Sequence, residues 1–225
     1  MTHLKRIAAP KTWPIKRKQN VWITRQNPGP HTSKTSISLN TVFKDLLKYT
    51  KTTRETKRIL NEGKILVNQK PRKGIRFPLG VFDVLSLPTG ENFRLLYDRI
   101  GKFVLKPVKK EEAEILLYKI KDKTILKNKK VQLNFNDGTN LLVPKDEYSV
   151  GDTIVMEKGK IKSHFIFDDS SIVYVIGGKH IGTSGELKKS ENKYLVKTKK
   201  DSFLVLKEHI FVIGKDKPLI TISEK

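Results

Sequence analysis

The sequence has 225 residues, and its 46 lysines and arginines against 23 aspartates and glutamates leave a formal net charge of +23. Such a charge opposes a compact fold by self-repulsion unless a polyanion neutralises it, so nucleic acid and an anionic membrane are the partners to weigh. The chain has no cysteine, which excludes disulfide frameworks, thiolate nucleophiles and cysteine-ligated zinc. No apolar run approaches the roughly 20 residues of a membrane span, and the N-terminus lacks the apolar core of a secretory signal. We therefore expect a soluble, cytoplasmic protein.

The positive charge is concentrated in the first third of the chain. Residues 1–80 contain 19 lysines and arginines and three acids, a net +16, whereas the remaining 145 residues carry only +7. A surface that only aids solubility is usually mixed in sign, so this asymmetry favours a nucleic-acid partner. A membrane is disfavoured because the prolines and polar residues of the first segment leave no continuous apolar helix face to insert.

Residues 1–38 are rich in lysine, arginine, threonine and serine and contain four prolines. This composition denies a regular helix and is too poor in apolar residues for a core of its own, so it predicts an extended basic arm. Trp13 and Trp22 lie among the cations. They are interpreted in two ways that the sequence leaves open: stacking on RNA, or packing on the protein's own core. The arm residues predicted to contact RNA are Lys5, Arg6, Lys11, Trp13, Lys16, Arg17, Lys18, Trp22, Arg25 and His31.

Two helices are predicted after the arm. Apolar residues at positions 39, 42, 43, 46 and 47 have the spacing of an amphipathic helix. Thr52 and Glu55 then form the pattern of a capping box that opens a second helix, which is expected to stop at Gly63. On this second helix the cationic and apolar residues fall on opposite sides: Arg54, Lys57 and Arg58 on one, and Thr56, Ile59 and Leu60 on the other.

A basic hairpin is predicted next, with strands over residues 64–68 and 81–85 and a turn over 68–71. Two short helices followed by such a hairpin resemble the αL RNA-binding motif of several ribosomal proteins, tRNA synthetases and pseudouridine synthases. The resemblance implies that the second helix and the start of the hairpin form the RNA face. The RNA-binding residues predicted in this segment are Lys51, Arg54, Lys57, Arg58, Lys64, Lys70, Arg72, Lys73 and Arg76.

The second half of the chain consists mostly of short β-type runs. Candidate strands lie at residues 95–97, 103–105, 131–135, 141–143 and 154–156, and one short helix is predicted over 111–120. This spacing predicts a small β-rich or barrel-like domain. Its charge is near balance, so we expect it to act as a scaffold.

A separate C-terminal module is predicted from a strand at 173–176, a glycine-rich loop at 177–185 and strands at 194–198, 203–206 and 209–213. Glycines in such a loop allow tight turns with exposed backbone amides, which suit close approach to phosphates. The pattern resembles a KOW module, an SH3-like barrel of ribosomal and transcription-elongation proteins. The loop residues predicted to contact RNA are Gly178, Lys179, His180 and Gly182.

Catalytic and metal sites find little support in the sequence. The five histidines, at positions 3, 31, 164, 180 and 209, have no metal-ligand spacing. Asp168 and Asp169 are adjacent, so in a strand their side chains would point to opposite faces. The loop after Gly177 lacks the Lys-Ser/Thr pair of a phosphate-binding loop. We therefore expect no enzyme, no metal, no cofactor and no small-molecule substrate.

Several motifs occur in order along the chain. They are His-Leu-Lys-Arg-x-Ala-Ala-Pro-x-x-Trp at 3–13, Gly-Pro-His at 29–31, Gly-Glu-Asn-Phe-Arg-Leu-x-Tyr-Asp at 90–98, Gly-Gly-Lys-His-x-Gly at 177–182 and Phe-Val-Ile-Gly-Lys at 211–215. Together they are similar to small-ribosomal-subunit protein four of the archaeal and eukaryotic type, the S-four-e family, and the short C-terminal tail is more typical of archaea.

This resemblance implies an α+β, mostly β fold in four parts. They are a basic extended arm (1–38), an αL-type RNA-binding domain (39–92), a central β-rich domain (93–170) and a KOW-type SH3-like domain with a tail (171–225). It also implies a structural constituent of the small subunit, bound to 16S-type rRNA and to neighbouring ribosomal proteins. A KOW-containing transcription or RNA-processing factor that is not permanently on the ribosome is the alternative, and an RNA-modifying enzyme comes third.

Overall fold

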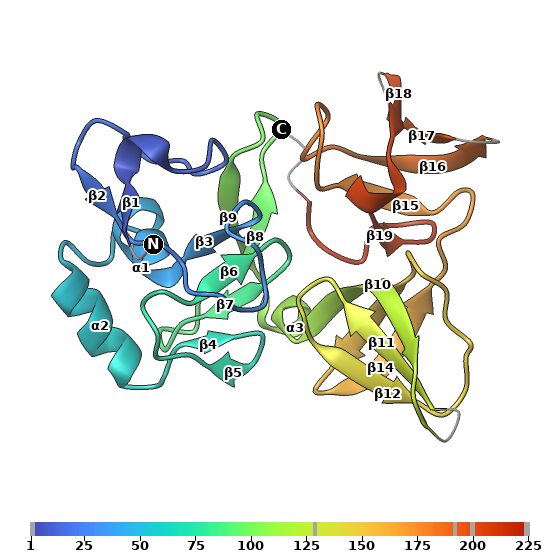
Figure 1. Cartoon of the computed structure of the whole chain (residues 1–225), viewed down its shortest axis with the longest axis horizontal. Coiled ribbons are helices and arrows are strands. Elements are labelled where there is room, and N and C mark those ends of the chain that lie inside the picture. Colours follow the sequence, from blue (N-terminus) through green and yellow to red (C-terminus); the bar gives the residue numbers. More distant parts are fainter. Residues whose placement is uncertain (1–2, 128–129, 191–192, 199–200, 223–225) are drawn as a thin grey trace. The chain divides into compact units, whose positions relative to one another are not determined.

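The computed structural model describes residues 3–127, 130–190, 193–198 and 201–222 (Figure 1). The fold is α+β and mostly β, as predicted. It forms two compact units, and most of unit 1 precedes unit 2 in the chain. Unit 1 comprises Met1–Tyr97 and Lys102–Glu114, and unit 2 comprises Asp98–Gly101 and Ile115–Lys225. In the described part of the chain, no helix combines the length and apolar character needed to cross a membrane.

Unit 1 is built on short antiparallel strands. A five-stranded sheet has the order β5-β4-β7-β8-β9, and a two-stranded sheet joins β3 to β6. The strands are β3 (Ser36–Ser38), β4 (Leu66–Val67), β5 (Lys70–Pro71), β6 (Pro78–Gly80), β7 (Val84–Ser86), β8 (Asn92–Tyr97) and β9 (Phe103–Val108). Leu79, Leu85 and Leu95 are fully buried, so these strands supply the core of the unit.

The two predicted helices are present in unit 1. The first consists of α1 (Leu39–Thr41), which continues as the π-helix η2 (Val42–Leu46). The hydroxyl of Ser38 caps α1 by accepting a hydrogen bond from the amide of Thr41. The second is α2 (Thr53–Asn61), which ends just before Gly63, whose φ of 73° places it in the left-handed region that favours glycine.

The N-terminal segment, expected to be an extended basic arm, contacts the rest of unit 1. It forms the strands β1 (Leu4–Lys5) and β2 (Trp22–Ile23) and the short 3-10 helix η1 (Arg6–Ala8). Trp13 is 1% exposed, and its indole N–H donates to the Ser36 carbonyl at 2.9 Å. The segment needs few apolar residues of its own, because Trp13 packs into the core of unit 1.

Unit 2 contains two five-stranded antiparallel sheets, with orders β12-β11-β10-β13-β14 and β18-β17-β16-β15-β19. The strands of the first are β10 (Ile115–Ile125), β11 (Val131–Phe135), β12 (Asn140–Val143), β13 (Thr153–Glu157) and β14 (Lys160–Phe165). Those of the second are β15 (Ile172–Val175), β16 (Ser184–Ser190), β17 (Lys193–Lys197), β18 (Ser202–Val205) and β19 (Ile210–Gly214). Within this second sheet, the 3-10 helix η4 (Lys207–His209) connects β18 to β19. Each sheet encloses its own apolar cluster, centred on Leu133 and Ile154 in the first and on Val173 and Val212 in the second.

The helix predicted over residues 111–120 is wrong. Helix α3 covers only Lys110–Ala113, and the chain then enters the long strand β10, which begins at Ile115. Leu116 and Leu117 face Met156 and Val155 across the ladder with β13. The apolar run after Glu114 gains burial and cross-strand hydrogen bonds in the sheet, and these outweigh the helix propensity of the glutamates before it.

Lys119 on β10 connects the two sheets of unit 2. Its residue is only 7% exposed, and its ammonium donates to the carbonyls of Lys207, Glu208 and Ile210 at 3.0, 3.0 and 2.6 Å. These three acceptors match the three donors of an ammonium group. Burial lowers the pKa of Lys119 to about 8, and the nearby Lys207 adds to this effect.

The Lys119→Met variant should be less stable by about 2 kcal/mol at pH 7, because three buried carbonyls lose their donor. The difference should also depend on pH. Above pH 8 the folded protein releases the Lys119 proton while the unfolded chain keeps it up to about pH 10.5, so the wild type gains stability through this window. Urea unfolding of both proteins at several pH values measures this gap, and a gap that does not widen between pH 8 and 10 would contradict a buried, titrating Lys119.

Candidate nucleic-acid interface

Helix α2 presents a one-sided cationic surface. Arg54, Lys57 and Arg58 are all exposed, whereas Thr56 and Leu60 are fully buried. The spacing i, i+3, i+4 brings the three cations onto one face of the helix. We name these three side chains the α2 cationic face, and its separation of charged and buried sides is the one that the sequence predicted.

The predicted capping box holds the start of α2 in place. The Thr52 hydroxyl accepts a hydrogen bond from the Glu55 amide at 3.2 Å, and Glu55 Oε2 accepts from the amides of Lys51 and Thr52 at 2.9 and 3.4 Å. The Lys51 amide and the Thr52 side chain hold the pKa of Glu55 below its usual value. The Glu55 carboxylate therefore binds backbone amides at the start of the helix, although it lies beside the α2 cationic face.

A basic hairpin follows α2, but it is tighter than predicted: β4 pairs with β5 at residues 70–71, which were expected in the turn, and also with β7, which begins at Val84. Asn68 and Gln69 form its turn with φ values of 49° and 64°, the left-handed pair of a type I′ turn. The Asn68 amide side chain donates to Asp83 at 2.7 Å and accepts from the Val84 amide at 2.9 Å, which fixes the turn to the sheet. Arg72 is half-buried, with its guanidinium 4.5 Å from the centre of the Phe77 ring. The hairpin side chains that remain exposed are Lys64, Lys70, Lys73 and Arg76.

Asp83 is a buried centre of hydrogen bonds in unit 1, with its side chain 5% exposed. Its Oδ2 accepts from the Gly80 amide at 2.7 Å and faces His31 Nε2 at 3.0 Å, and its Oδ1 accepts from Asn68. The His31 ring lies against Gly80 so closely that a Cβ there would be 2.4 Å from the ring atoms. The sequence predicts that His31 contacts RNA. In the structure its side chain is buried and faces the Asp83 carboxylate.

Three further N-terminal residues of the predicted set make contacts within the protein. Arg6 is 4% exposed, forms an ion pair with Asp45 and donates from Nε to the Lys16 carbonyl at 2.7 Å. Trp13 lies in the core, which answers the question that the sequence left open for this residue. Arg17 is half-buried and donates to the carbonyls of Ile7, Ala9 and Pro10. The exposed cations of the described part of the segment are Lys5, Lys11, Lys16, Lys18 and Lys34.

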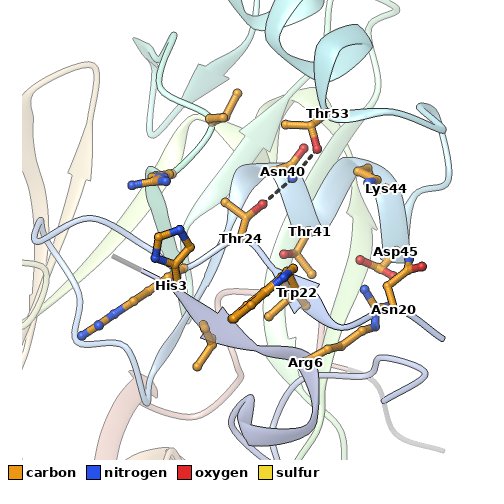
Figure 2. A pocket seen from close by; sticks show the side chains of 15 residues that line it. His3, Arg6, Asn20, Trp22, Thr24, Asn40, Thr41, Lys44, Asp45 and Thr53 are labelled. Atoms are coloured by element: carbon orange, nitrogen blue, oxygen red, sulfur yellow. Dashed lines mark hydrogen bonds and ion pairs between the residues drawn. The ribbon is translucent and has the colours of Figure 1, made fainter. Parts of the chain in front are cut away.

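Trp22 is different, because 57% of its surface is exposed. It borders a hollow of about 280 Å³ that lies between the β1–β2 pair and the helices of unit 1. In Figure 2 the Trp22 indole lies between His3 on one side and Arg6 on the other, with Thr24, Asn40 and Thr53 on the wall beyond it. The charged residues lining the hollow are Arg6, Arg25, Lys44, Asp45 and Arg76.

The sequence identified Arg6, Trp22, Arg25 and Arg76 as RNA-binding candidates but not the other side chains around this hollow. Asn40, Lys44 and Thr53 were read only as parts of helices. The periodicity of an amphipathic helix indicates which residues are buried. It does not indicate that a polar side chain such as Asn40 lines a hollow together with residues 16 or more positions earlier in the chain.

In the glycine-rich loop of unit 2, Gly182 allows close packing of the backbone and does not expose its amide to solvent. Gly182 is buried with a φ of 82°, and a Cβ there would be 2.4 Å from the Asp98 carbonyl oxygen. Its amide donates to the Val175 carbonyl at 2.9 Å, so this amide is already paired within the protein. The His180 ring is stacked on Phe203 with centroids 3.9 Å apart. Gly178 and Lys179 are the exposed members of the predicted set.

The described residues contain no cluster of histidine and carboxylate side chains that could hold a metal ion. Asp168 is exposed and pairs with Lys189 at 2.8 Å, and this pairing lowers the pKa of the carboxyl. The carboxyl of Asp169 accepts from the Lys189 amide, so the two adjacent aspartates support a surface turn. Positive charge, and not an acid–base pair, characterises the candidate surface.

Comparisons with known proteins find relatives among ribosomal proteins, which is consistent with a positively charged surface. A family model described as "Ribosomal family S4e" matches residues 89–162, and one described as "RS4NT (NUC023) domain" matches residues 2–34. The chain is 39% identical to the small ribosomal subunit protein eS4 of Methanosphaera stadtmanae, over 98% of this chain and 95% of that protein. It is 40% identical to the protein of the same name from Methanocella arvoryzae, over 97% and 96%. The crystal structure of the 30S ribosomal protein S4e from Thermoplasma acidophilum matches with a TM-score of 0.71 and 28% identity, covering 83% of this chain and 99% of that one.

Proposed function

Because the chain belongs to the family of small ribosomal subunit protein eS4, we propose that it is a structural constituent of the small subunit. In this role it binds the subunit's 16S-type rRNA in the cytoplasm, contacts neighbouring ribosomal proteins and catalyses no reaction. The single observation that carries the RNA-binding role is the α2 cationic face, where three exposed cations stand on a helix whose other side is buried.

The mechanism is neutralisation of phosphates between RNA helices. Exposed lysines and arginines on α2, on the hairpin and in the N-terminal segment release counterions when they meet phosphates, and this supplies affinity. Phosphate contacts position a protein without reading sequence, so specificity comes from RNA shape and from exposed bases. The proposed phosphate contacts are Lys5, Lys11, Lys16, Lys18, Lys51, Arg54, Lys57, Arg58, Lys64, Lys70, Lys73 and Arg76.

We also propose the finer division of labour that the sequence suggested. Residues 39–92 act as an αL-type RNA-binding domain, which the order helix, capped helix and basic hairpin supports. Residues 93–170 act as a β-rich scaffold, and residues 171–225 act as a KOW-type module. The five-stranded order β18-β17-β16-β15-β19 supports an SH3-like arrangement of this last part. Gly178 and Lys179 in its loop are the RNA contacts proposed there.

Co-sedimentation with the small subunit tests the proposal. The protein should remain at one copy per subunit through a moderate-salt wash, as a structural constituent does. A factor that visits the ribosome would wash off, and that result would contradict the proposed function.

The affinity for isolated small-subunit rRNA should fall steeply with salt. If six to ten cations contact phosphates, the affinity should fall by roughly 10³–10⁵ between low and moderate salt, taking the slope for duplex DNA as a guide. Filter binding at a series of salt concentrations measures the slope. A nearly flat dependence would show that phosphate contacts are not the main source of affinity.

A further inference from the structure

We propose that the hollow beside Trp22 receives one unstacked RNA nucleotide whose base carries an exocyclic amino group. The base lies against the Trp22 indole, and its phosphates meet the cations around the hollow. This inference rests on the proposed RNA-binding function and adds to it a site that reads a base. The α2 cationic face contacts the backbone only.

The aromatic side of the hollow is built by the paired strands β1 and β2. Trp22 lies opposite Lys5 in this pair, and the His3 ring is 5.7 Å from the indole, tilted by 60°. The contrast with Trp13 is informative, because one tryptophan is 1% exposed and the other 57%. A large aromatic side chain held at the edge of a cationic hollow is the arrangement on which proteins stack unpaired bases.

The polar wall of the hollow has a missing donor. Asn40 is 4% exposed, and its amide nitrogen donates to the Thr24 hydroxyl at 2.5 Å and more weakly to the Thr53 hydroxyl at 3.4 Å. Its Oδ1 is buried and, among the described residues, has no hydrogen-bond partner. Buried acceptors are rarely left in this state, so the oxygen is suited to a donor supplied by a ligand. The exocyclic amino group of cytosine, adenine or guanine is such a donor, whereas uracil lacks an amino group and has only the N–H of its ring.

The charge of the hollow favours a phosphate-bearing ligand. Asp45 is the one carboxylate in its lining, and it forms an ion pair with Arg6. Arg25, Lys44 and Arg76 are the other charged side chains of the lining, and all three are positive. The volume of about 280 Å³ suits one base. A base stacked inside an A-form helix cannot enter such a hollow, so the nucleotide is one from a loop, a bulge or an end.

Tryptophan fluorescence gives a direct test, because the chain has only two tryptophans. The probes are single-stranded hexacytidylate and hexauridylate, which differ at the amino group of the base, and a blunt RNA duplex. Hexacytidylate should quench the exposed Trp22, hexauridylate should quench it at several-fold higher concentrations only, and the duplex should not. The Trp22→Phe variant, which keeps a stacking ring, reports the background signal of Trp13. The affinity of Trp22→Ala for hexacytidylate, measured by fluorescence polarisation of labelled RNA, should be lower by roughly tenfold.

The outcomes separate this inference from the function on which it rests. Wild-type protein that binds small-subunit rRNA, but whose Trp22 is not quenched by hexacytidylate or is quenched equally by the duplex, overturns the nucleotide site and leaves the function standing. Equal quenching by the two hexanucleotides overturns the assignment of an amino-bearing base. Wild-type protein that fails to bind small-subunit rRNA overturns the proposed function itself.

Discussion

Replacing Arg54 and Arg58 together by glutamate is expected to weaken binding of small-subunit rRNA by at least about 100-fold at moderate salt. Each cation that contacts phosphate adds about one to the slope of log affinity against log salt. The double variant loses two such contacts and places two carboxylates against the RNA backbone, so its slope should fall by about two. Filter binding of wild type and variant across salt concentrations measures both effects.

The fold should survive this change. Both side chains are exposed, and the helix is held by its buried face and by the Thr52–Glu55 capping box, which the substitutions leave intact. A glutamate at position 54 is in the first turn, where the helix dipole favours it, and one at 58 costs only a few tenths of a kcal/mol. An unchanged far-ultraviolet circular dichroism spectrum and urea midpoint confirm that any loss of binding belongs to the interface.

A matched charge reversal in unit 2 provides the control. Lys121 and Lys160 are exposed on strands β10 and β14, and replacing both by glutamate changes the net charge of the protein by the same amount. This control should weaken binding much less, because it alters only the long-range attraction, which salt screens. Equal losses in the two double variants would mean that net charge, and not the α2 cationic face, governs binding.

Local chemistry explains what the sequence could predict. The capping box of α2 depends on two residues three positions apart, and the cationic face on residues within one turn of helix, so both are visible in a short window. The turn at Asn68 is predictable for the same reason. The strands of unit 2 follow from short apolar runs, although their pairing does not.

The fate of the N-terminal cations could not be predicted in this way. Arg6 is buried because Asp45 lies 39 positions later in the chain, and Trp13 because the Ser36 carbonyl accepts its indole N–H across 23 positions. Composition shows that a segment is basic, but burial of an arginine is decided by a distant carboxylate. Gly182 is a further example. A side chain at this position would collide with the backbone of Asp98, which is distant in the sequence, so the requirement for glycine is not visible in a short window.

The second large effect is expected at Asp83. The Asp83→Ala variant should lose about 3–5 kcal/mol of unfolding free energy in unit 1, the range measured when one partner of a buried ionic group is removed. The Gly80 amide, the Asn68 side chain and His31 would all lose their acceptor. Phe82, beside it, adopts a φ of 71°, a conformation that costs about 1–3 kcal/mol and persists only where neighbouring contacts enforce it.

Two other substitutions show whether the loss comes from the buried acceptor. Asp83→Asn keeps one acceptor oxygen, so its loss should be smaller than that of Asp83→Ala. Asp146→Ala removes an exposed carboxylate that pairs with Lys123 at 2.5 Å, and such surface pairs contribute only about 0–1 kcal/mol. Amide hydrogen exchange of strands β4, β6 and β7 localises the effect to unit 1. If Asp83→Ala and Asp146→Ala were equally stable, the hydrogen bonds to Asp83 would contribute no more than an exposed ion pair, and His31 would be better explained by its packing on Gly80.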